Sequence, residues 1–539
     1  MTLVDTDTSF DQTSTHSEPE AWRPGLAHPR RRQILLVLCL SLLVVTIDNT
    51  ILNTALPTLA RDLHASTRGL QWITDAYTLV FAALLVTAGA LGDRFGNRRA
   101  LIGGLVLFAA GSIGAALSGG TGTLIGFRAA MGLGAAFVMP GTLSILSAVF
   151  PPAERSSAIG AWSAVAGVGI VIGPTLGGFL LDHFSWGSVF WVNVPLAALA
   201  IAGVRAVVPS AKTGAGHPLD PIGALISIAG LAALVDAVIE APDRGWLSAL
   251  TLLEAAAAVI LIGAFIVYEL RSSHPMIDIR VFANRAFSGA AASVTLIFFT
   301  LFGSLFALTQ YLQLVHGYTA LSAGIRALPF AAAMGALSPL STVLAGRLGV
   351  RRVLPSGLVL MAAGLAWLAQ AQPTTPYLTV MGAVVLMGAG MGLVMAPAST
   401  VIMNSLPLHQ AGAGSAVNDT VREVGGALGV AVIGSLVSAG YRAHLHLPAV
   451  LPASVAHVAR SSIAAADIVA QRAGAASPAI TTSAHSAFTT AMGHGFEVAA
   501  AVALIGAVVT WLRLPGRTAA PAPSANVIEM AGCVVAAQA

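Results

Sequence analysis

The residues of this sequence that could do chemistry are charged side chains inside long apolar runs, where a charge is costly and usually functional. Asp48 lies in the apolar run 34–55, and Arg128 lies in the run 122–146. At about 1.5 Å of rise per helical residue, Asp48 lies about 12 Å before the end of its run and Arg128 lies about 9 Å after the start of its own. In helices that run in opposite directions these depths are similar, so the two side chains can pair. A buried carboxylate beside a mobile arginine can alternate between an ionised, paired state and a protonated state, which is the chemistry of proton coupling. A static ion pair is the other interpretation.

A second group of charges lies in the runs 411–438 and 71–92. Asp419 and Glu423 are four residues apart and share a helix face, so their mutual repulsion would favour protonation of one of them in a cavity. The neighbouring Arg422 could equally neutralise one carboxylate. Asp75, close to the outer end of its run, could receive protons or substrate, or it could cap a helix.

Aromatic side chains offer a candidate pocket, because they hold flat lipophilic molecules through stacking and cation–π contacts. Phe299, Phe302 and Phe306 recur on one stripe of the run 287–315. The same rings could instead face lipid or pack between helices. The predicted pocket consists of Trp162, Phe299, Phe302, Phe306, Gln310 and Tyr311.

Transmembrane helices must position these residues, because the composition excludes a water-soluble surface. Of the 539 residues, 56% are hydrophobic and only 9% are charged, and the mean hydropathy is +0.82. Soluble domains carry about 25% charged residues. A span needs roughly 20 apolar residues. Fourteen runs qualify, at 34–55, 71–92, 99–119, 122–146, 157–181, 188–208, 221–240, 248–269, 287–315, 322–345, 352–371, 378–403, 411–438 and 488–512.

The basic residues orient these helices. With both termini in the cytoplasm, eighteen Lys and Arg residues fall inside, six outside and three within spans, in agreement with the positive-inside rule. We therefore expect a multi-pass protein of the inner (plasma) membrane, with cytoplasmic tails at 1–33 and 514–539. The long external loop 439–487 predicts a short hairpin or cap.

An internal repeat divides the chain into two halves. Residues 92–99 (GDRFGNRR) match residues 345–352 (AGRLGVRR) at an offset of 253. Duplicated halves are common in transporters, with the substrate site at their interface near the membrane midplane. The predicted fold class is an all-α membrane protein of fourteen transmembrane helices. Two six-helix bundles, 34–208 and 271–513, are joined by a linker, 209–270, that carries two inserted helices.

Four segments are distinctive. They are DNTILNTALP at 48–57, GALGDRFGNRR at 89–99, Arg128 with Gly132 and Gly134, and GIVIGPTLGG at 169–178. Together they resemble the major facilitator superfamily and, within it, the fourteen-helix drug:proton antiporters and the quaternary-ammonium multidrug exporters. The resemblance extends over about residues 33–513 and implies the major facilitator fold. Met131 departs from the glutamine common before the glycines, and Met334 stands where exporters of divalent cations can carry an aspartate.

The resemblance implies roles for two of these segments. A conformational latch between the halves comprises Gly89, Asp93, Arg94, Gly96, Arg98 and Arg99. The antiporter motif comprises Gly169, Gly173, Pro174, Gly177 and Gly178. Glycines every four residues form a smooth helix stripe. We expect this stripe to be a close, pliable contact between the halves that resists proton leak, with generic small-residue packing as the alternative.

The sequence therefore predicts a proton-coupled antiporter that works by alternating access. Its expected substrates are hydrophobic drugs or biocides, mainly cationic ones. A dedicated exporter of one metabolite or natural product is the alternative, and a non-transporting receptor is a third reading. Met334 joins the predicted pocket. Proton coupling is assigned to Asp48, Arg128, Asp419, Glu423 and Asp75.

The expected partners are a small-molecule substrate, protons and the lipid bilayer, and we expect a monomer. The sequence has no Walker-type loop, metal-ligand cluster or nucleophile motif. We therefore expect no enzymatic activity, no nucleic-acid partner, no metal and no cofactor, with the proton gradient as the energy source.

Overall fold

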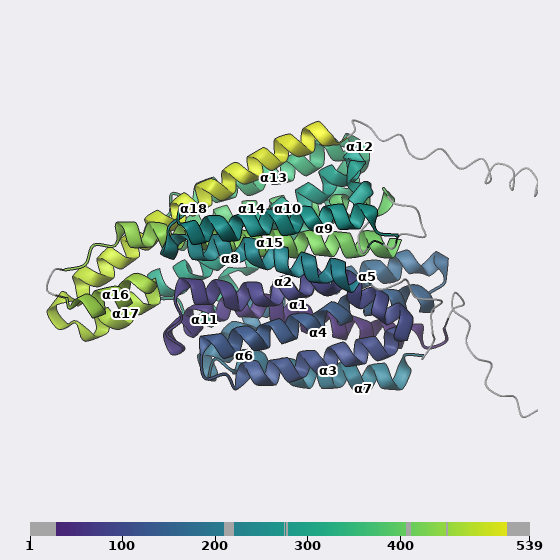
Figure 1. Ribbon diagram of the computed structural model, residues 1–539, viewed down its shortest axis with the longest axis horizontal. Helices are drawn as coiled ribbons and strands as arrows, with labels where there is room; N and C mark the ends of the chain where they lie inside the picture. The colour runs from purple at the N-terminus through teal and green to yellow at the C-terminus, as the bar shows by residue number, and fades with distance from the viewer. Residues whose placement is uncertain are drawn as a thin grey trace, which may run out of the picture.

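The computed structural model describes residues 28–209, 220–273, 275, 279–405, 411–448 and 451–514, and every regular element in these ranges is a helix. Two groups of long helices lie side by side (Figure 1). The first group contains α1 (Arg31–Asp62), α2 (Thr67–Phe95), α3 (Asn97–Ala116), α4 (Thr121–Val149), α5 (Pro152–His183), α6 (Ser188–Trp191) and α7 (Asn193–Val207).

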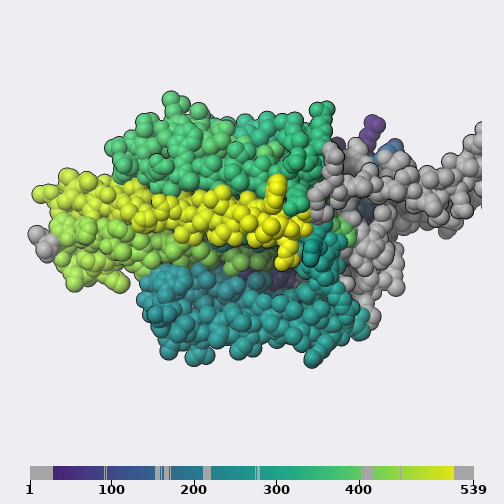
Figure 2. All heavy atoms as spheres, turned by 90° about the horizontal axis from the view of Figure 1, so that it is seen from above, coloured from purple at the N-terminus to yellow at the C-terminus, as the bar shows by residue number. Residues whose placement is uncertain are grey.

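The second group follows a helical hairpin and a short 3₁₀ turn, η1 (Ile279–Ala283). The hairpin consists of α8 (Pro221–Arg244) and α9 (Ala249–Arg271), and it forms a ridge along one flank of the face seen in Figure 2. The second group contains α10 (Arg285–Gln310), η2 (Tyr311–Val315), α11 (Ala320–Arg326), α12 (Leu328–Leu348), α13 (Val350–Leu368), α14 (Tyr377–Asn404), α15 (Ala411–His444) and α18 (Ser477–Arg513).

Twelve helical segments in the described ranges are long and apolar enough to cross a membrane. Two further helices, α2 and α5, are 29 and 32 residues long. They pack among the twelve, α2 against α4 and α15, and α5 against α1 and α11. The prediction of an all-α membrane protein is therefore confirmed.

Between α15 and α18 the chain forms two short helices, α16 (Ala453–Ser461) and α17 (Ile463–Arg472), followed by η4 (Gly474–Ala476). They project from one end of the molecule, which we name the cap end (Figure 1). Tyr441 of α15 donates a hydrogen bond to the Ala459 carbonyl at 3.1 Å. Thr67 of α2 donates to the Ser461 carbonyl at 3.4 Å, so the cap contacts both groups of helices.

Three of the predicted spans are interrupted. The run 188–208 divides into α6 and α7, 287–315 continues from α10 into the π-helical η2, and 322–345 divides into α11 and α12. Pro329 lies in the first turn of α12. Its ring cannot donate a backbone hydrogen bond to the preceding turn, so the helix breaks there. This break places Arg326 at the end of its own short helix.

The two groups meet at the cap end through side-chain amides. Gln313 of η2 donates to the Thr54 carbonyl of α1 at 2.8 Å. Gln71 of α2 donates to the Val430 and Ala431 carbonyls of α15 at 3.3 and 2.9 Å. An amide that hydrogen-bonds to the opposite backbone holds two apolar helices in register.

The repeated segments adopt the same local structure in both groups. Gly96 between α2 and α3 has φ +101°, and Gly349 between α12 and α13 has φ +84°. Only glycine adopts such angles without strain, which explains its presence in both copies.

The arginines of the repeat also correspond. Arg98 donates to the Arg205 carbonyl near the end of α7 at 2.7 Å. Arg351, its counterpart at the offset of 253, donates to the Trp511 carbonyl near the end of α18 at 2.9 Å. Each arginine thus satisfies a carbonyl in the last turn of its group's final helix, which is a favourable place for a cation.

Candidate functional site

An ion pair is buried inside the first group of helices. Arg128 Nη1 of α4 lies 2.6 Å from Asp48 Oδ2 of α1, and both side chains are fully buried. Arg128 Nε also donates to the Ile73 carbonyl of α2 at 3.2 Å. The guanidinium lies over the Tyr77 ring, 4.3 Å from its centroid. The two residues therefore pair, as their similar depths predict.

A second side chain binds the carboxylate of this pair. Asn193 at the start of α7 donates through Nδ2 to Asp48 Oδ1 at 2.7 Å and to Ser112 Oγ at 3.0 Å. Ser112 of α3 in turn donates to the Phe190 carbonyl at 2.8 Å. Sequence analysis missed Asn193, although an asparagine inside an apolar run is itself a signal of a buried polar contact.

Asp75 of α2 differs from Asp48. Its side chain is fully buried, and neither carboxylate oxygen has a hydrogen-bond partner among the described residues. Gln71 and Leu79 lie one helical turn away on either side. Both contact α15, Gln71 by its amide and Leu79 by packing with Ala427 and Ala431. Asp75 shares their face, so it lies where the two groups of helices meet.

The charges of α15 are divided between a pair and an unpaired acid. Arg422 Nη1 lies 3.1 Å from Asp419 Oδ1, and its guanidinium lies 5.2 Å from the Phe298 ring centroid. Glu423 makes no hydrogen bond or ion pair within the part of the chain that the structure describes. Arg422 thus neutralises Asp419 here and leaves Glu423 without a partner.

A narrow cavity of about 90 Å³ lies between the two groups. Thr50, Asn53 and Thr54 of α1 and Pro174 of α5 line one side. The opposite side comes from α10, η2, α11, α12 and α14. Because the Gln313–Thr54 hydrogen bond lies beside it, the cavity is toward the cap end of the bundle.

Of the predicted aromatic pocket, the described cavity contains one residue, Phe302. Phe302 lines the cavity, and Phe298, Leu305, Phe330 and Tyr377 line it with Phe302. Phe306, Gln310 and Tyr311 are at most 2% exposed and are not among the lining residues. α10 is apolar on all faces, so periodicity alone could not tell its cavity face from its packing face.

The other predicted pocket residues also make packing contacts. Trp162 donates to Thr142 Oγ1 of α4 at 3.2 Å, within the first group. Tyr311 donates to the Gln372 carbonyl at 2.7 Å. The Phe299 carbonyl meets Gly429 of α15, and the Met334 carbonyl of α12 meets Gly392 of α14, leaving no room for a Cβ at either glycine.

Arg326 is a site residue that sequence analysis counted as a charge within a span but did not assign to the pocket. Of the described residues that line the cavity, Arg326 alone carries a charge. Its guanidinium lies 3.9 Å from the Tyr318 ring centroid and 5.0 Å from that of Tyr377. Tyr377 also donates to the Arg326 carbonyl at 2.9 Å, which fixes the end of α11 beside α14.

The glycine stripe of α5 packs within its own group. A Cβ on Gly173 would overlap with Thr50 Oγ1 of α1, and one on Gly177 would lie 2.5 Å from Ile51 Cγ1. Thr50 Oγ1 donates to the Gly169 carbonyl at 3.1 Å. The expectation that this stripe joins the two halves is therefore wrong, because it faces α1 of the same half.

The contact between halves uses the neighbouring face of α5. A Cβ on Gly178 would lie 2.5 Å from the Ala320 carbonyl oxygen of α11. A Cβ on Gly324 of α11 would overlap with the Pro174 carbonyl. Pro174 and Gly178 thus allow the backbones of α5 and α11 to touch, one residue beyond the stripe.

The predicted latch lies at the end of the bundle away from the cap. Gly89 packs on Pro140 of α4. A Cβ on Gly89 would lie 3.4 Å from the Pro140 Cβ, which is an ordinary contact. Arg94 and Arg99 are exposed. The side chain of Asp93 lies outside the described residues, so its predicted pairing with an arginine stays a prediction.

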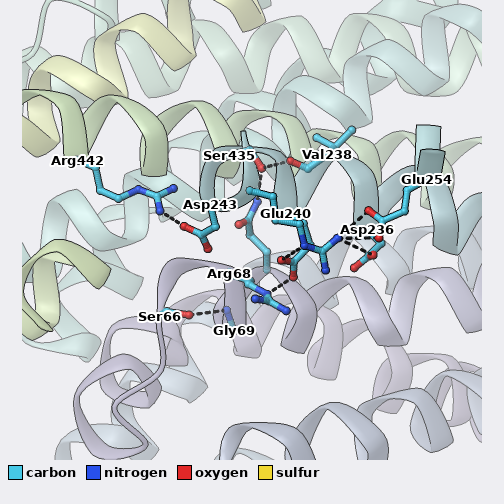
Figure 3. Close-up of polar contacts among 12 residues, drawn as sticks. Ser66, Arg68, Gly69, Asp236, Val238, Glu240, Asp243, Glu254, Ser435 and Arg442 are labelled. Atoms are coloured by element: carbon cyan, nitrogen blue, oxygen red, sulfur yellow. Dashed lines mark hydrogen bonds and ion pairs between the residues drawn. The ribbon is translucent and has the colours of Figure 1, made fainter. Parts of the chain in front are cut away.

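Four helices meet in an ion network at the cap end (Figure 3). The side chain of Glu240 is 1% exposed and pairs with Arg68 of α2 and with Arg244 at 3.3 Å. Arg244 also pairs with Glu254 of α9 at 2.7 Å. Asp243 of α8 pairs with Arg442 of α15, so this network ties the α8–α9 hairpin to both groups.

Comparison with known proteins identifies a family that the chain matches. Residues 38–430 match the model of the Major Facilitator Superfamily. The chain is 34% identical over 518 residues to the tetracenomycin C resistance and export protein of Streptomyces glaucescens, covering 92% of this chain and 95% of the relative. It is 34% identical over 488 residues to the methyl viologen resistance protein SmvA of Salmonella typhimurium (strain 14028s / SGSC 2262), covering 89% and 97%.

Among solved structures, the fold is similar to an inward-facing bacterial homologue of the human lysosomal transporter Spinster. The TM-score is 0.65 at 19% identity, covering 92% of this chain and 100% of the other. At that identity the likeness speaks for the fold alone.

Proposed function

The chain belongs to the Major Facilitator Superfamily and is a membrane transporter. From this premise we propose that it is a proton-coupled antiporter that exports lipophilic, drug-like compounds by alternating access. The observation that carries the proposal is the apolar cavity between the two groups of helices, beside contacts that close it at the cap end. A cavity at the interface of two movable halves is where such transporters bind substrate.

We propose that α2 and α5 also span the membrane, which makes fourteen transmembrane helices with the hairpin α8–α9 inserted between two six-helix bundles. Both termini are then cytoplasmic, the cap end is external, and the protein resides in the inner membrane as a monomer. The basic residues support this orientation, since they are concentrated on the side away from the cap.

Among the acidic residues, Asp75 and Glu423 are the best candidates to carry the proton. A carboxylate inside the bundle that forms no ion pair has little to offset the cost of its charge, so it is suited to carry a proton until the helices move. Asp75 lies at the contact between the halves, where motion would change its surroundings. Asp48 and Asp419, by contrast, are held by arginines, so we propose that they respond to the motion.

The glycine contacts fit this motion. Close backbone packing between α5 and α11 at Pro174 and Gly178 would let the two halves rock without opening a water path. The latch arginines Arg94, Arg98 and Arg99 would then stabilise the outward-facing state, in which the cap end is open.

The proposal is tested in vesicles that contain purified protein and a pH-sensitive dye. Under an imposed proton gradient, ethidium and the neutral anthraquinone-2-carboxamide are added in turn. We expect at least one of them to move against its gradient and to dissipate the pH difference. Asp75→Asn should abolish this coupled movement but retain gradient-independent exchange of labelled compound, because the substrate cavity is intact.

Asp182→Asn is the matched control, since Asp182 is an exposed carboxylate on α5. If neither compound moves in the wild type, proton-coupled export of such compounds is wrong. If Asp75→Asn transports normally, the proton is carried elsewhere and Glu423 becomes the next residue to replace.

A dedicated exporter of one natural product is the second candidate. The similarity to the Streptomyces relative, a tetracenomycin C resistance and export protein, favours it. Transport of a single member of a chemically varied panel, rather than several, would favour this reading.

A further inference from the structure

The lining of the cavity between the halves carries a positive charge, which is unusual for a site expected to hold cations. Its walls are mainly Leu, Ala, Val and Met side chains with the rings of Phe298, Phe302, Phe330 and Tyr377. Its polar contributors are threonine hydroxyls, the Asn53 amide and one charged group, Arg326. No acidic residue is among the lining residues that the structure describes.

Arg326 has no carboxylate partner in the described ranges. Its Nη1 donates to the Ser322 carbonyl at 3.1 Å and to the Ser322 hydroxyl, while its Nε is buried without an acceptor. Every partner of this guanidinium in the described part of the chain is therefore neutral. A partly buried cation held only by neutral groups has no counter-charge and can attract an anion.

Aromatic rings hold this guanidinium at the cavity wall. Tyr318 and Tyr377 lie on it by cation–π contact. His316 stacks on Tyr318, with ring centroids 5.3 Å apart. Burial first, and then the Arg326 charge, lower the pKa of the His316 imidazole below its ordinary value, which favours its neutral form. The region around Arg326 is thus positive but not crowded by a second cation.

We propose, on the premise of the export function above, that this cavity selects flat aromatic compounds that carry an acidic oxygen, such as a carboxylate or phenolate. Arg326 binds the oxygen, and the phenylalanine rings of α10 and α12 contact the ring system. An isolated lipophilic cation would instead be placed beside an arginine with no carboxylate to offset the repulsion.

This inference is opposite to the cationic substrates expected from sequence. It also separates this chain from the Salmonella relative, whose name refers to methyl viologen, a dication. A cavity of about 90 Å³ holds only a few water molecules. Binding a ring system therefore requires α1 and α5 to separate from α10 and α14, which is the motion that alternating access supplies.

The test is equilibrium binding to the purified full-length protein at neutral pH, with three probes that share one ring system. They are anthraquinone-2-carboxylate, the neutral anthraquinone-2-carboxamide and the cationic 2-(trimethylammoniomethyl)anthraquinone. We expect the carboxylate to bind about tenfold more tightly than the carboxamide, since a charge-assisted hydrogen bond is the stronger kind. The cation should bind more weakly than either.

Arg326→Gln should remove the preference, lowering carboxylate affinity about tenfold while carboxamide affinity changes less than about twofold. Arg326→Lys should keep most of the preference, because the charge remains. Arg351→Gln is the control. This arginine also lies over an aromatic ring, that of Trp511 at 5.1 Å, but at the far end of the second group.

Tightest binding of the cation to the wild type would overturn the inference, and so would an unchanged carboxylate preference in Arg326→Gln. If Arg326→Gln binds none of the probes, the lysine variant decides. Binding of the carboxamide without preference for the carboxylate in Arg326→Lys then counts against the inference.

The outcome is distinguishable from that of the proposed function. Selective carboxylate binding without any gradient-driven movement would contradict antiport but not the site. Gradient-driven movement of the cation or carboxamide, with no carboxylate binding, would contradict the site but not antiport.

Discussion

At Asp48 and Arg128, two opposite charges are buried together. Removing either one alone leaves the other as an unpaired charge in an apolar interior. Asn193 and the Ile73 carbonyl occupy further hydrogen-bonding positions of the pair. Replacing a buried pair as a whole is often neutral, whereas breaking it costs about 3–5 kcal/mol. The pair therefore supports the first group of helices independently of any role in transport.

Asp48→Asn is accordingly expected to lower the free energy of unfolding by about 3–5 kcal/mol, because Arg128 loses its counter-charge. Adding Arg128→Met should recover most of that loss. Denaturant unfolding in detergent, followed by tryptophan fluorescence, measures both variants. Equal stability of the single and double variants would show that the two charges are not coupled. Loss of transport in Asp48→Asn can be assigned to proton coupling only in variants that remain folded.

At the scale of elements, the contact of α1 with α5 depends on small residues. Gly173 lies against Thr50, and Thr50 donates to the Gly169 carbonyl. The stripe thereby fixes the helix that carries Thr50, Asn53 and Thr54 to the cavity. Its own face does not touch the second group, so it acts on transport through the position of α1.

Gly173→Leu should lower the free energy of unfolding by about 1–3 kcal/mol or more, because a branched side chain cannot fit against α1. Thermal unfolding of the detergent-solubilised protein measures the change. Gly126→Leu serves as the control, since no atom lies within 4 Å of a Cβ at Gly126 on the exposed side of α4, and such changes stay within about 0.5 kcal/mol. If the two variants unfold alike, tight packing of α5 is not what requires the glycine.

At the scale of the whole molecule, the α8–α9 hairpin is attached to both groups through charged residues at the cap end (Figure 3). Glu240 is the buried member, contacting Arg68 of α2 and Arg244. Because α2 and α15 belong to different groups, a relative motion of the groups would strain the ion pairs of the hairpin. We expect it to stabilise the arrangement in which the cap end is closed.

Glu240→Gln should loosen this attachment, because the amide cannot offset the charges of two arginines. The cost should be about 0.2–1 kcal/mol, because both arginines are partly exposed and solvent screens their charges. Hydrogen exchange of the α8 backbone, followed by mass spectrometry, should become faster. Glu254→Gln, which changes a more exposed carboxylate of the same network, should have a smaller effect. Unchanged exchange in Glu240→Gln would mean that packing alone holds the hairpin.

The sequence by itself determined the features that depend on composition and on spacing along the chain. Long apolar runs must become helices, because a bilayer satisfies no backbone hydrogen bonds. The repeat at an offset of 253 predicted corresponding turns, and Gly96 and Gly349 share their positive φ there. Similar depths in their spans indicated that Asp48 and Arg128 could pair, and they do.

Only the tertiary structure decided which face of each helix meets which neighbour. Phe302 faces the cavity while Phe306, one turn along, is fully buried away from it. The stripe of Gly169, Gly173 and Gly177 faces α1, and Gly178, one residue later, faces α11. In a water-soluble helix, polar residues mark the outer face, but in lipid both the outer and the packed faces are apolar. The sequence therefore says little about how each helix is rotated about its axis. The side chains around Arg326 are brought together only by the packing of the helices.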